Sequence, residues 1–250
     1  MKLNKFATTA ALAVGLIGFG APAQAVILTD IVWIVDTSGS MGDDITQVKS
    51  NILSFNTAMT TAGIDAQYGL VRFGGTASLI QDITTFSTFS QAGSPFQLFT
   101  ANGGGTEDGS AAIQVGMTAT FRANSVRNFI LVTDENDDVL TNRAALDTAL
   151  ASTGINELIN IIGNASDDDS NYYRNLAPAH GGAFFSITDF RANPQTFFTK
   201  FTTTKVQETV INFCEANPTD PQCLNTVPEP SVLALLGLGL LGLGFTRRKA

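Results

Sequence analysis

The amino-acid sequence predicts an α/β fold, in which a doubly wound, mainly parallel sheet carries helices on both faces. Short apolar runs alternate along the chain with longer segments that have helical spacing. The run 31–35 is apolar at every position, as expected for a strand that is buried on both faces. Between two distinctive chain ends lie about 200 residues without an internal repeat, which is the size of one domain.

The pattern in the first half of this domain predicts a strand, a helix and a pair of strands. Apolar residues recur every three or four positions in 43–62, where Asp43 and Asp44 suit the first turn of a helix. Gly74-Gly75 then separates two strand-like segments, which predicts an antiparallel pair. The expected elements are a strand at 31–35, a helix at 43–62, strands at 67–73 and 77–86, and a short helix with a loop at 87–100.

The second half continues the alternation of helices and strands. The expected elements are a helix at 107–121, a strand at 128–133, a helix at 143–151, strands at 158–162 and 183–187, and a last helix at 194–213. Ligands of such folds bind beyond the carboxyl ends of the strands, where the strand order reverses. Polar residues that follow the two most apolar strands are therefore the first candidates for a functional site.

Oxygen-bearing side chains occur at these positions. Asp36, Ser38 and Ser40 follow the first strand at alternate positions, and Asp134 follows the strand at 128–133. Thr106 comes directly after three glycines. Carboxylates and hydroxyls are hard ligands and suit a hard divalent cation such as Mg²⁺.

This set resembles the metal-ion-dependent adhesion site of the von Willebrand factor type A (vWA) domain, whose motif is D-x-S-x-S followed by a distant Thr and a distant Asp. The resemblance covers about residues 30–213. It implies a Rossmann-like, six-stranded sheet with one antiparallel edge strand. It also implies that the three hydroxyls touch the metal while the two carboxylates act mostly through bound waters. The metal would be Mg²⁺, with Mn²⁺ or Ca²⁺ as alternatives, and one coordination position would remain for an acidic group on a partner. These ligands are Asp36, Ser38, Ser40, Thr106 and Asp134.

One stretch departs from the family pattern, which often has Thr-Asp-Gly after the fourth strand. Here Thr133-Asp134 is followed by Glu135, and Asp137 and Asp138 come soon after. Extra carboxylates near the metal would strengthen cation binding, but they would also repel an acidic ligand. The choice of partner therefore stays open.

The amino end has the features of an export signal. Lys2 and Lys5 precede an uncharged stretch, and Ala23-Gln24-Ala25 offers small residues to a signal peptidase, so we expect residues 1–25 to be removed.

The carboxyl end resembles a PEP-CTERM sorting signal. Pro228, Glu229 and Pro230 precede an uncharged stretch at 231–246, and a basic cluster at 247–249 follows. In that family the tail, with its short hydrophobic helix, holds the protein transiently in the inner membrane of a Gram-negative bacterium until an exosortase-type protease removes it. The product would then reach the cell surface or the extracellular matrix. The alternative is a permanent membrane anchor.

Cys214 and Cys223 lie close together, and in an exported protein we expect them to be bridged. The expected organisation is a signal peptide at 1–25, a vWA domain at 26–213, a Cys-bridged linker at 214–227 and a sorting tail at 228–250.

The net charge of the processed chain restricts the class of partner that it is expected to bind. Processing at both ends removes five of the 14 basic residues and none of the 22 acidic ones, which leaves a net charge of −13. Such an acidic domain is not expected to bind nucleic acid or anionic lipid through bulk electrostatics.

The leading hypothesis is an exported module that binds a protein or an acidic matrix polysaccharide through a bridging cation. We expect no enzyme activity, because phosphatases with an aspartate at this place usually carry a second one two residues later, where this chain has Ser38. A metal-assisted extracellular hydrolase and a passive structural matrix protein are the alternatives.

Overall fold

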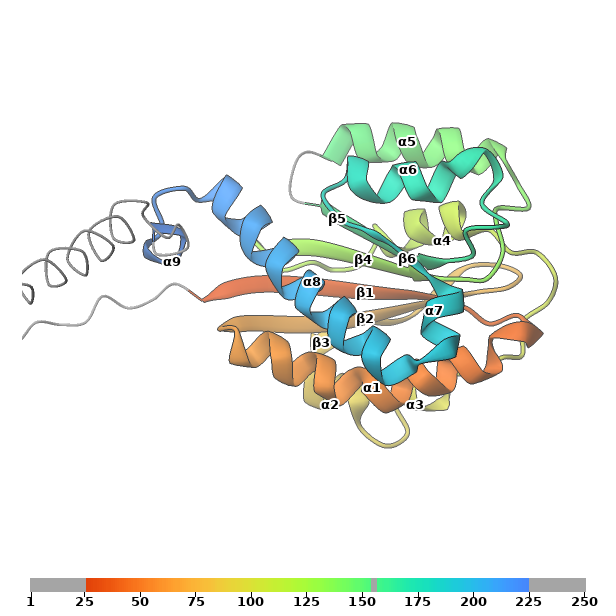
Figure 1. The fold of residues 1–250 in the computed structure, drawn as a ribbon, viewed down its shortest axis with the longest axis horizontal. Coiled ribbons are helices and arrows are strands. Elements are labelled where there is room, and N and C mark those ends of the chain that lie inside the picture. Colours follow the sequence, from red (N-terminus) through yellow and green to blue (C-terminus); the bar gives the residue numbers. More distant parts are fainter. Residues whose placement is uncertain (1–25, 154–156, 225–250) are drawn as a thin grey trace, which may run out of the picture.

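The computed structural model describes residues 26–153 and 157–224 (Figure 1). The expected signal peptide at 1–25 lies outside the described residues, as does the sorting tail with Pro228, Glu229 and Pro230. None of the helices in the described part of the chain has the length and apolarity needed to span a membrane.

The described residues form one sheet of six strands in the order β3-β2-β1-β4-β5-β6. Every pair of neighbours is parallel except β2 and β3, which puts an antiparallel strand at one edge. The fold class and the antiparallel edge strand predicted from the sequence are confirmed. The strands are β1 Ile27–Asp36, β2 Ile64–Phe73, β3 Ser78–Thr85, β4 Val126–Val132, β5 Glu157–Gly163 and β6 Phe184–Ser186.

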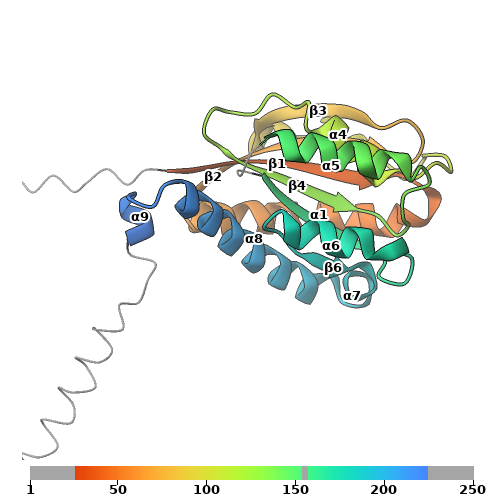
Figure 2. The ribbon, with the colours of Figure 1, turned by 90° about the horizontal axis from the view of Figure 1, so that it is seen from above.

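Helices cover both faces of this sheet (Figures 1 and 2). One face carries α1 Gly42–Thr61, α7 Ile187–Ala192 and α8 Pro194–Ala216. The other carries α4 Gly109–Gly116, α5 Thr141–Thr153 and α6 Tyr172–Ala179. The shorter helices are the 3-10 turns η1 Gly39–Met41 and η2 Asp169–Asn171, α2 Phe86–Ser90, α3 Pro95–Leu98 and α9 Pro221–Leu224.

The alternation of side chains along β1 produces two separate cores. Ile31, Trp33 and Val35 belong to the core under α1 and α8, whereas Val32 and Ile34 belong to the core under α4 and α5. All five are fully buried, which explains why the run is apolar at every position. The Trp33 ring lies 5.5 Å from the ring of Phe55 in α1 and 6.1 Å from that of Phe201 in α8, measured between centroids.

Some element boundaries differ from the prediction. The helix predicted at 107–121 is shorter in the structure, where α4 ends at Gly116. It begins at Gly109, because Asp108 caps its start by accepting a hydrogen bond from Ala111 N at 3.0 Å. The strand predicted at 183–187 ends at Ser186, whose hydroxyl accepts from Asp189 N and starts α7. The pattern did not indicate α6, α7 or α9, which are too short for a clear helical period.

The predicted disulfide is present. Cys214 and Cys223 are bonded, with their Cα atoms 5.3 Å apart. The bond ties α9 to the end of α8, which continues to Ala216, past its predicted end at 213. Figures 1 and 2 place α9 at the end of the domain where β1 begins.

A buried ion pair holds the loop before β4 against the start of β1. Asp30 is fully buried and accepts hydrogen bonds from Arg122 N at 2.6 Å, from Arg122 Nε at 2.7 Å and from Ser125 Oγ at 2.9 Å. The Arg122 guanidinium also donates to the Asp65 carbonyl oxygen at 2.8 Å, at the start of β2. One arginine therefore connects the entries of two strands and the loop before a third.

We expect Arg122→Met to destabilise the domain by about 3 kcal/mol, because the change leaves the Asp30 carboxylate buried without its cation. Urea denaturation of the mature domain measures the loss. Arg72→Met, at an exposed position of β2, is the matched control and should change stability by less than about 0.5 kcal/mol. Equal effects of the two substitutions would contradict the role given to Arg122.

Candidate metal centre

The site is built from three loops that meet at the carboxyl ends of β1 and β4. The glycine-rich loop before α4 is hydrogen bonded through backbone atoms to the loop after β1 and to the turn between β2 and β3. Gly103 N donates to Thr37 O at 2.7 Å, and Gly75 N donates to Thr106 O at 2.7 Å. A Cβ atom at Gly103 would lie 2.6 Å from the carbonyl oxygen of Gly74, so only glycine allows this approach.

Four of the five predicted ligands form one continuous chain of hydrogen bonds. Asp36 is fully buried, and its carboxylate accepts from Ser38 N at 2.7 Å and from Thr133 Oγ1 at 3.0 Å. The hydroxyl oxygens of Ser38 and Ser40 lie 3.1 Å apart. Ser40 Oγ in turn donates to Asp134 Oδ1 at 3.0 Å. The structure thus brings the D-x-S-x-S motif and the distant aspartate together.

Thr106 takes no part in this chain of hydrogen bonds, and its place among the ligands stays a prediction. Thr106 is exposed. No hydrogen bond within the described part of the chain joins its hydroxyl to the other four predicted ligands. Its carbonyl oxygen, which accepts from Gly75 N, keeps the loop at the rim of the site.

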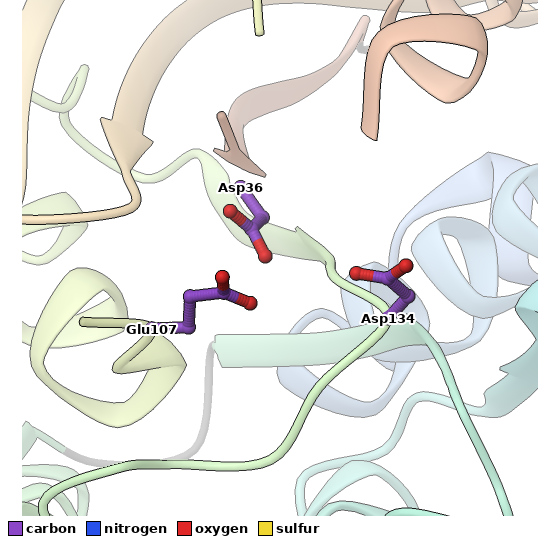
Figure 3. A group of neighbouring side chains, drawn as sticks. All are labelled: Asp36, Glu107 and Asp134. Atoms are coloured by element: carbon purple, nitrogen blue, oxygen red, sulfur yellow. The ribbon is translucent and has the colours of Figure 1, made fainter. Parts of the chain in front are cut away.

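The next residue, Glu107, points into the site and was missed by sequence reasoning. Carboxylate oxygens of Asp36, Glu107 and Asp134 all lie within 4.8 Å of one another, and Figure 3 shows the three side chains converging. Glu107 is only 6% exposed, and its Oε2 atom is buried without a hydrogen-bond partner among the described residues. The available signal was an acidic residue directly after a predicted ligand in a glycine-rich loop.

This crowding changes the proton affinity of the carboxyl groups. Burial, together with the neighbouring charge of Asp36, raises the pKa of Glu107 to about 8. Burial also raises the pKa of Asp36, although the hydrogen bonds from Ser38 and Thr133 act in the opposite direction. Both shifts mean that the ionised carboxylates are unfavourable here unless a positive charge is close.

Arg191 of α7 supplies part of that charge. Its guanidinium donates to Asp134 Oδ2 at 2.8 Å and to Asp44 Oδ2 at 2.6 Å. The hydrogen bonds to Asp44 and Asp134 raise the pKa of Arg191. Because Asp44 is buried in α1, the arginine connects two helices to the loop after β4. It leaves Oδ1 of Asp134 directed at Ser40.

The additional carboxylates after Asp134 have other contacts. Asp137 is buried and accepts from Arg143 Nε at 2.9 Å and from the Tyr173 hydroxyl at 2.6 Å. Asp138 Oδ2 accepts from Glu107 N at 2.7 Å. These residues therefore hold the loop and the Glu107 backbone in place.

The donor set fits a hard divalent cation. It offers three carboxylates at close range together with two hydroxyls, and Glu107 Oε2 has an open lone pair directed into a buried place. Asp36, Glu107 and Asp134 would supply the negative charge, and Ser38 and Ser40 would supply neutral oxygen ligands.

Comparison with known families agrees with this geometry. The family model of the von Willebrand factor type A domain matches residues 30–200. The model of the PEP-CTERM protein-sorting motif matches residues 226–249. That motif indicates export, processing by an exosortase-type enzyme, and targeting to the bacterial surface or exterior. A search of curated protein sequences returned no match.

Solved structures show the same fold at low sequence identity. Proximal thread matrix protein 1 (PTMP1) from the mussel byssus is 15% identical, with a TM-score of 0.52, over 76% of this chain and 49% of that chain. A structure described as von Willebrand factor type A from Catenulispora acidiphila is 20% identical, with a TM-score of 0.52, over 73% of this chain and 43% of that chain. The present chain therefore spans about half the length of these two proteins or less. With the family model covering residues 30–200 and the sheet order in agreement, the chain belongs to the von Willebrand factor type A domain family.

Proposed function

We propose that this protein is an exported, metal-ion-dependent binding module. It binds an acidic group on a protein or a matrix polysaccharide through a bridging divalent cation, with Mg²⁺ as the expected ion. The observation that carries the proposal is the convergence of Asp36, Glu107 and Asp134 within 4.8 Å on an exported chain. vWA domains are in general binding or adhesion modules and not enzymes, which supports the same class of function.

The proposed organisation follows from this role. A signal peptide at 1–25 starts export, the binding domain occupies 26–213, the Cys-bridged linker occupies 214–227, and the sorting tail occupies 228–250. Retention in the inner membrane is then transient, and the mature domain acts at the cell surface or in the matrix.

The chain's own residues explain how the site would work. Asp36 is fixed by two hydrogen bonds and Asp134 by Arg191, so neither carboxylate has to be ordered when a cation binds. Ser38 and Ser40 add oxygen ligands without charge, which keeps a bound cation electrophilic. Such a cation supplies a Lewis-acidic position that a carboxylate of the partner can fill.

Glu107 modifies the expected family pattern. It adds a third carboxylate directly after Thr106, for which the resemblance implies a hydroxyl ligand. We expect tighter cation binding as a result, because each added carboxylate lowers the free energy of the cation in the site. The net charge of −13 also means that an acidic partner is repelled at long range, so that moderate salt should favour its association.

Asp36→Ala should weaken Mg²⁺ binding by more than about tenfold, because it removes a buried carboxylate from the centre of the cluster. Titration calorimetry of the mature domain measures this. Asp43→Ala is the matched control, because Asp43 is exposed on α1 near the site and does not belong to the carboxylate cluster. The proposal fails if both variants bind Mg²⁺ as the unmodified domain does.

Without divalent cations, the domain should become less stable as the pH rises from about 4.5 to about 8. The raised pKa of Glu107 means that the folded state binds this proton more tightly than the unfolded state. Its contribution is therefore full below the unfolded pKa and disappears as the pH passes the folded pKa. Saturating Mg²⁺ should reduce the loss, since the cation replaces the proton.

Thermal unfolding at a series of pH values, in EDTA and in Mg²⁺, tests this expectation. Glu107→Gln should flatten the profile in EDTA over the same pH range, and it should reduce the stabilisation by Mg²⁺. A profile that is unchanged by the substitution would show that Glu107 does not control the electrostatics of the site.

Immobilised mature domain should capture a component of the native extracellular matrix in Mg²⁺ and release it in EDTA. Asp36→Ala should capture little in either buffer, whereas Asp43→Ala should behave as the unmodified domain. Stabilisation by Mg²⁺ without any metal-dependent capture would instead favour a passive structural role.

A further inference from the structure

A lysine lies entirely inside the domain, at the interface between α8 and the sheet. Lys205 has no exposed surface. Its ammonium nitrogen contacts the amide oxygen of Asn128 on β4 and lies 3.0 Å from Glu208 Oε2, one turn further along α8. A fully buried lysine is rare because desolvation of its charge is costly. Its position beside an amide and a carboxylate therefore calls for a chemical explanation.

The Asn128 side chain is held in one orientation. It is fully buried, and its Nδ2 atom donates to Thr29 Oγ1 at 3.1 Å and to Thr209 Oγ1 at 3.2 Å. Because the two hydroxyls accept from the nitrogen, the amide oxygen faces Lys205. The amine and the carboxamide are thus held in contact by groups from β1, β4 and α8.

The surroundings favour the uncharged amine. Ile31 and Leu158 are the neighbours of Asn128 on the two adjacent strands, and Phe201 lies one turn before Lys205 on α8. All three are buried. Burial lowers the pKa of Lys205, although the Glu208 carboxylate opposes this shift. A neutral amine is a nucleophile, whereas an ammonium ion is not.

We propose that Lys205 and Asn128 become joined by an intramolecular isopeptide bond, with Glu208 as the catalytic acid and base. The Lys205 Nζ atom forms a bond with Asn128 Cγ, and the bond from Cγ to Nδ2 breaks. Glu208 takes a proton from Nζ and returns a proton to the departing nitrogen, which leaves as ammonia. A primary amine and a primary amide thus yield a secondary amide and ammonia, without an oxidant or any other reactant.

The three groups have the roles that this reaction requires. Glu208 lies in contact with the reacting amine, and its side chain is 12% exposed. Once it has taken the proton from Nζ, Glu208 is the acid that gives a proton to the departing nitrogen. Because the two residues are already in contact, the reaction gains the advantage of an intramolecular encounter.

The bond would connect the middle of the sheet to the last long helix. Lys205 and Asn128 are 77 positions apart in sequence, so the link closes a large loop of the chain. The disulfide ties α9 to the end of the same helix (Figure 2). A force applied to α9 would then reach the sheet through covalent bonds. This inference does not depend on the metal-binding proposal.

Intact mass spectrometry of the purified mature chain, reduced and denatured, tests the proposal. We expect a mass lower than that of the sequence by one ammonia. Trypsin cleaves after Arg127 and Lys200, so digestion should yield a branched peptide that joins the segment starting at Asn128 to the segment starting at Phe201. The full sequence mass would overturn the proposal. Loss of ammonia with two separate peptides would also overturn it, because that result indicates a succinimide.

Matched variants test the roles of Lys205, Glu208 and Asn128 separately. Lys205→Arg and Glu208→Gln should both keep the full mass, whereas Lys200→Arg and Glu215→Gln, at exposed positions of α8, should still lose ammonia. Asn128→Asp should lose water in place of ammonia, since the leaving group is then a hydroxyl. A branched peptide formed equally well by Glu208→Gln would overturn the role of Glu208.

Discussion

The concentration of negative charge at the carboxyl ends of β1 and β4 is the constraint on which the rest of the structure depends. Asp36, Glu107 and Asp134 place their oxygens within 4.8 Å of one another in a mostly buried setting. Such a cluster is unfavourable without protons or a cation: burial raises the pKa of both Asp36 and Glu107, and the charge of Asp36 adds to the shift of Glu107. The parallel sheet causes the convergence, because it brings the ends of neighbouring strands to one edge.

The surrounding structure offsets part of this cost and holds the loops in place. Thr133 and the Ser38 amide donate to Asp36, and Arg191 donates to Asp134. The glycine-rich loop approaches the residues after β1 closely enough to hydrogen bond with the Thr37 backbone, and a side chain at Gly103 would prevent this approach. The carboxylates are therefore already held in place by the folded chain, as the proposed binding of a cation requires.

A second polar cluster lies within the core beneath α8, where Lys205 and Asn128 meet inside apolar surroundings. The same physical rule applies to both clusters, since a buried polar or charged group requires a close partner. They differ in what the partner is. At the strand ends the missing positive charge would come from solution, whereas beneath α8 the amine, the amide and Glu208 all come from the chain itself. The disulfide then reinforces the same helix near its end.

The sequence by itself determined the order of the strands and of the longer helices, and it indicated four side chains that the structure joins by hydrogen bonds. Apolar runs and helical spacing are local properties, and the motif Asp36, Ser38 and Ser40 is local as well. Asp134 could be placed because it follows a recognisable strand. Only the tertiary structure decided that Glu107 enters the site while Thr106 stays exposed, because neighbouring residues in a loop point in directions that no sequence period defines. The contact of Lys205 with Asn128 likewise depends on how α8 packs on the sheet. Burial and pairing of charges between distant residues arise from packing, and packing exists only when the chain has folded.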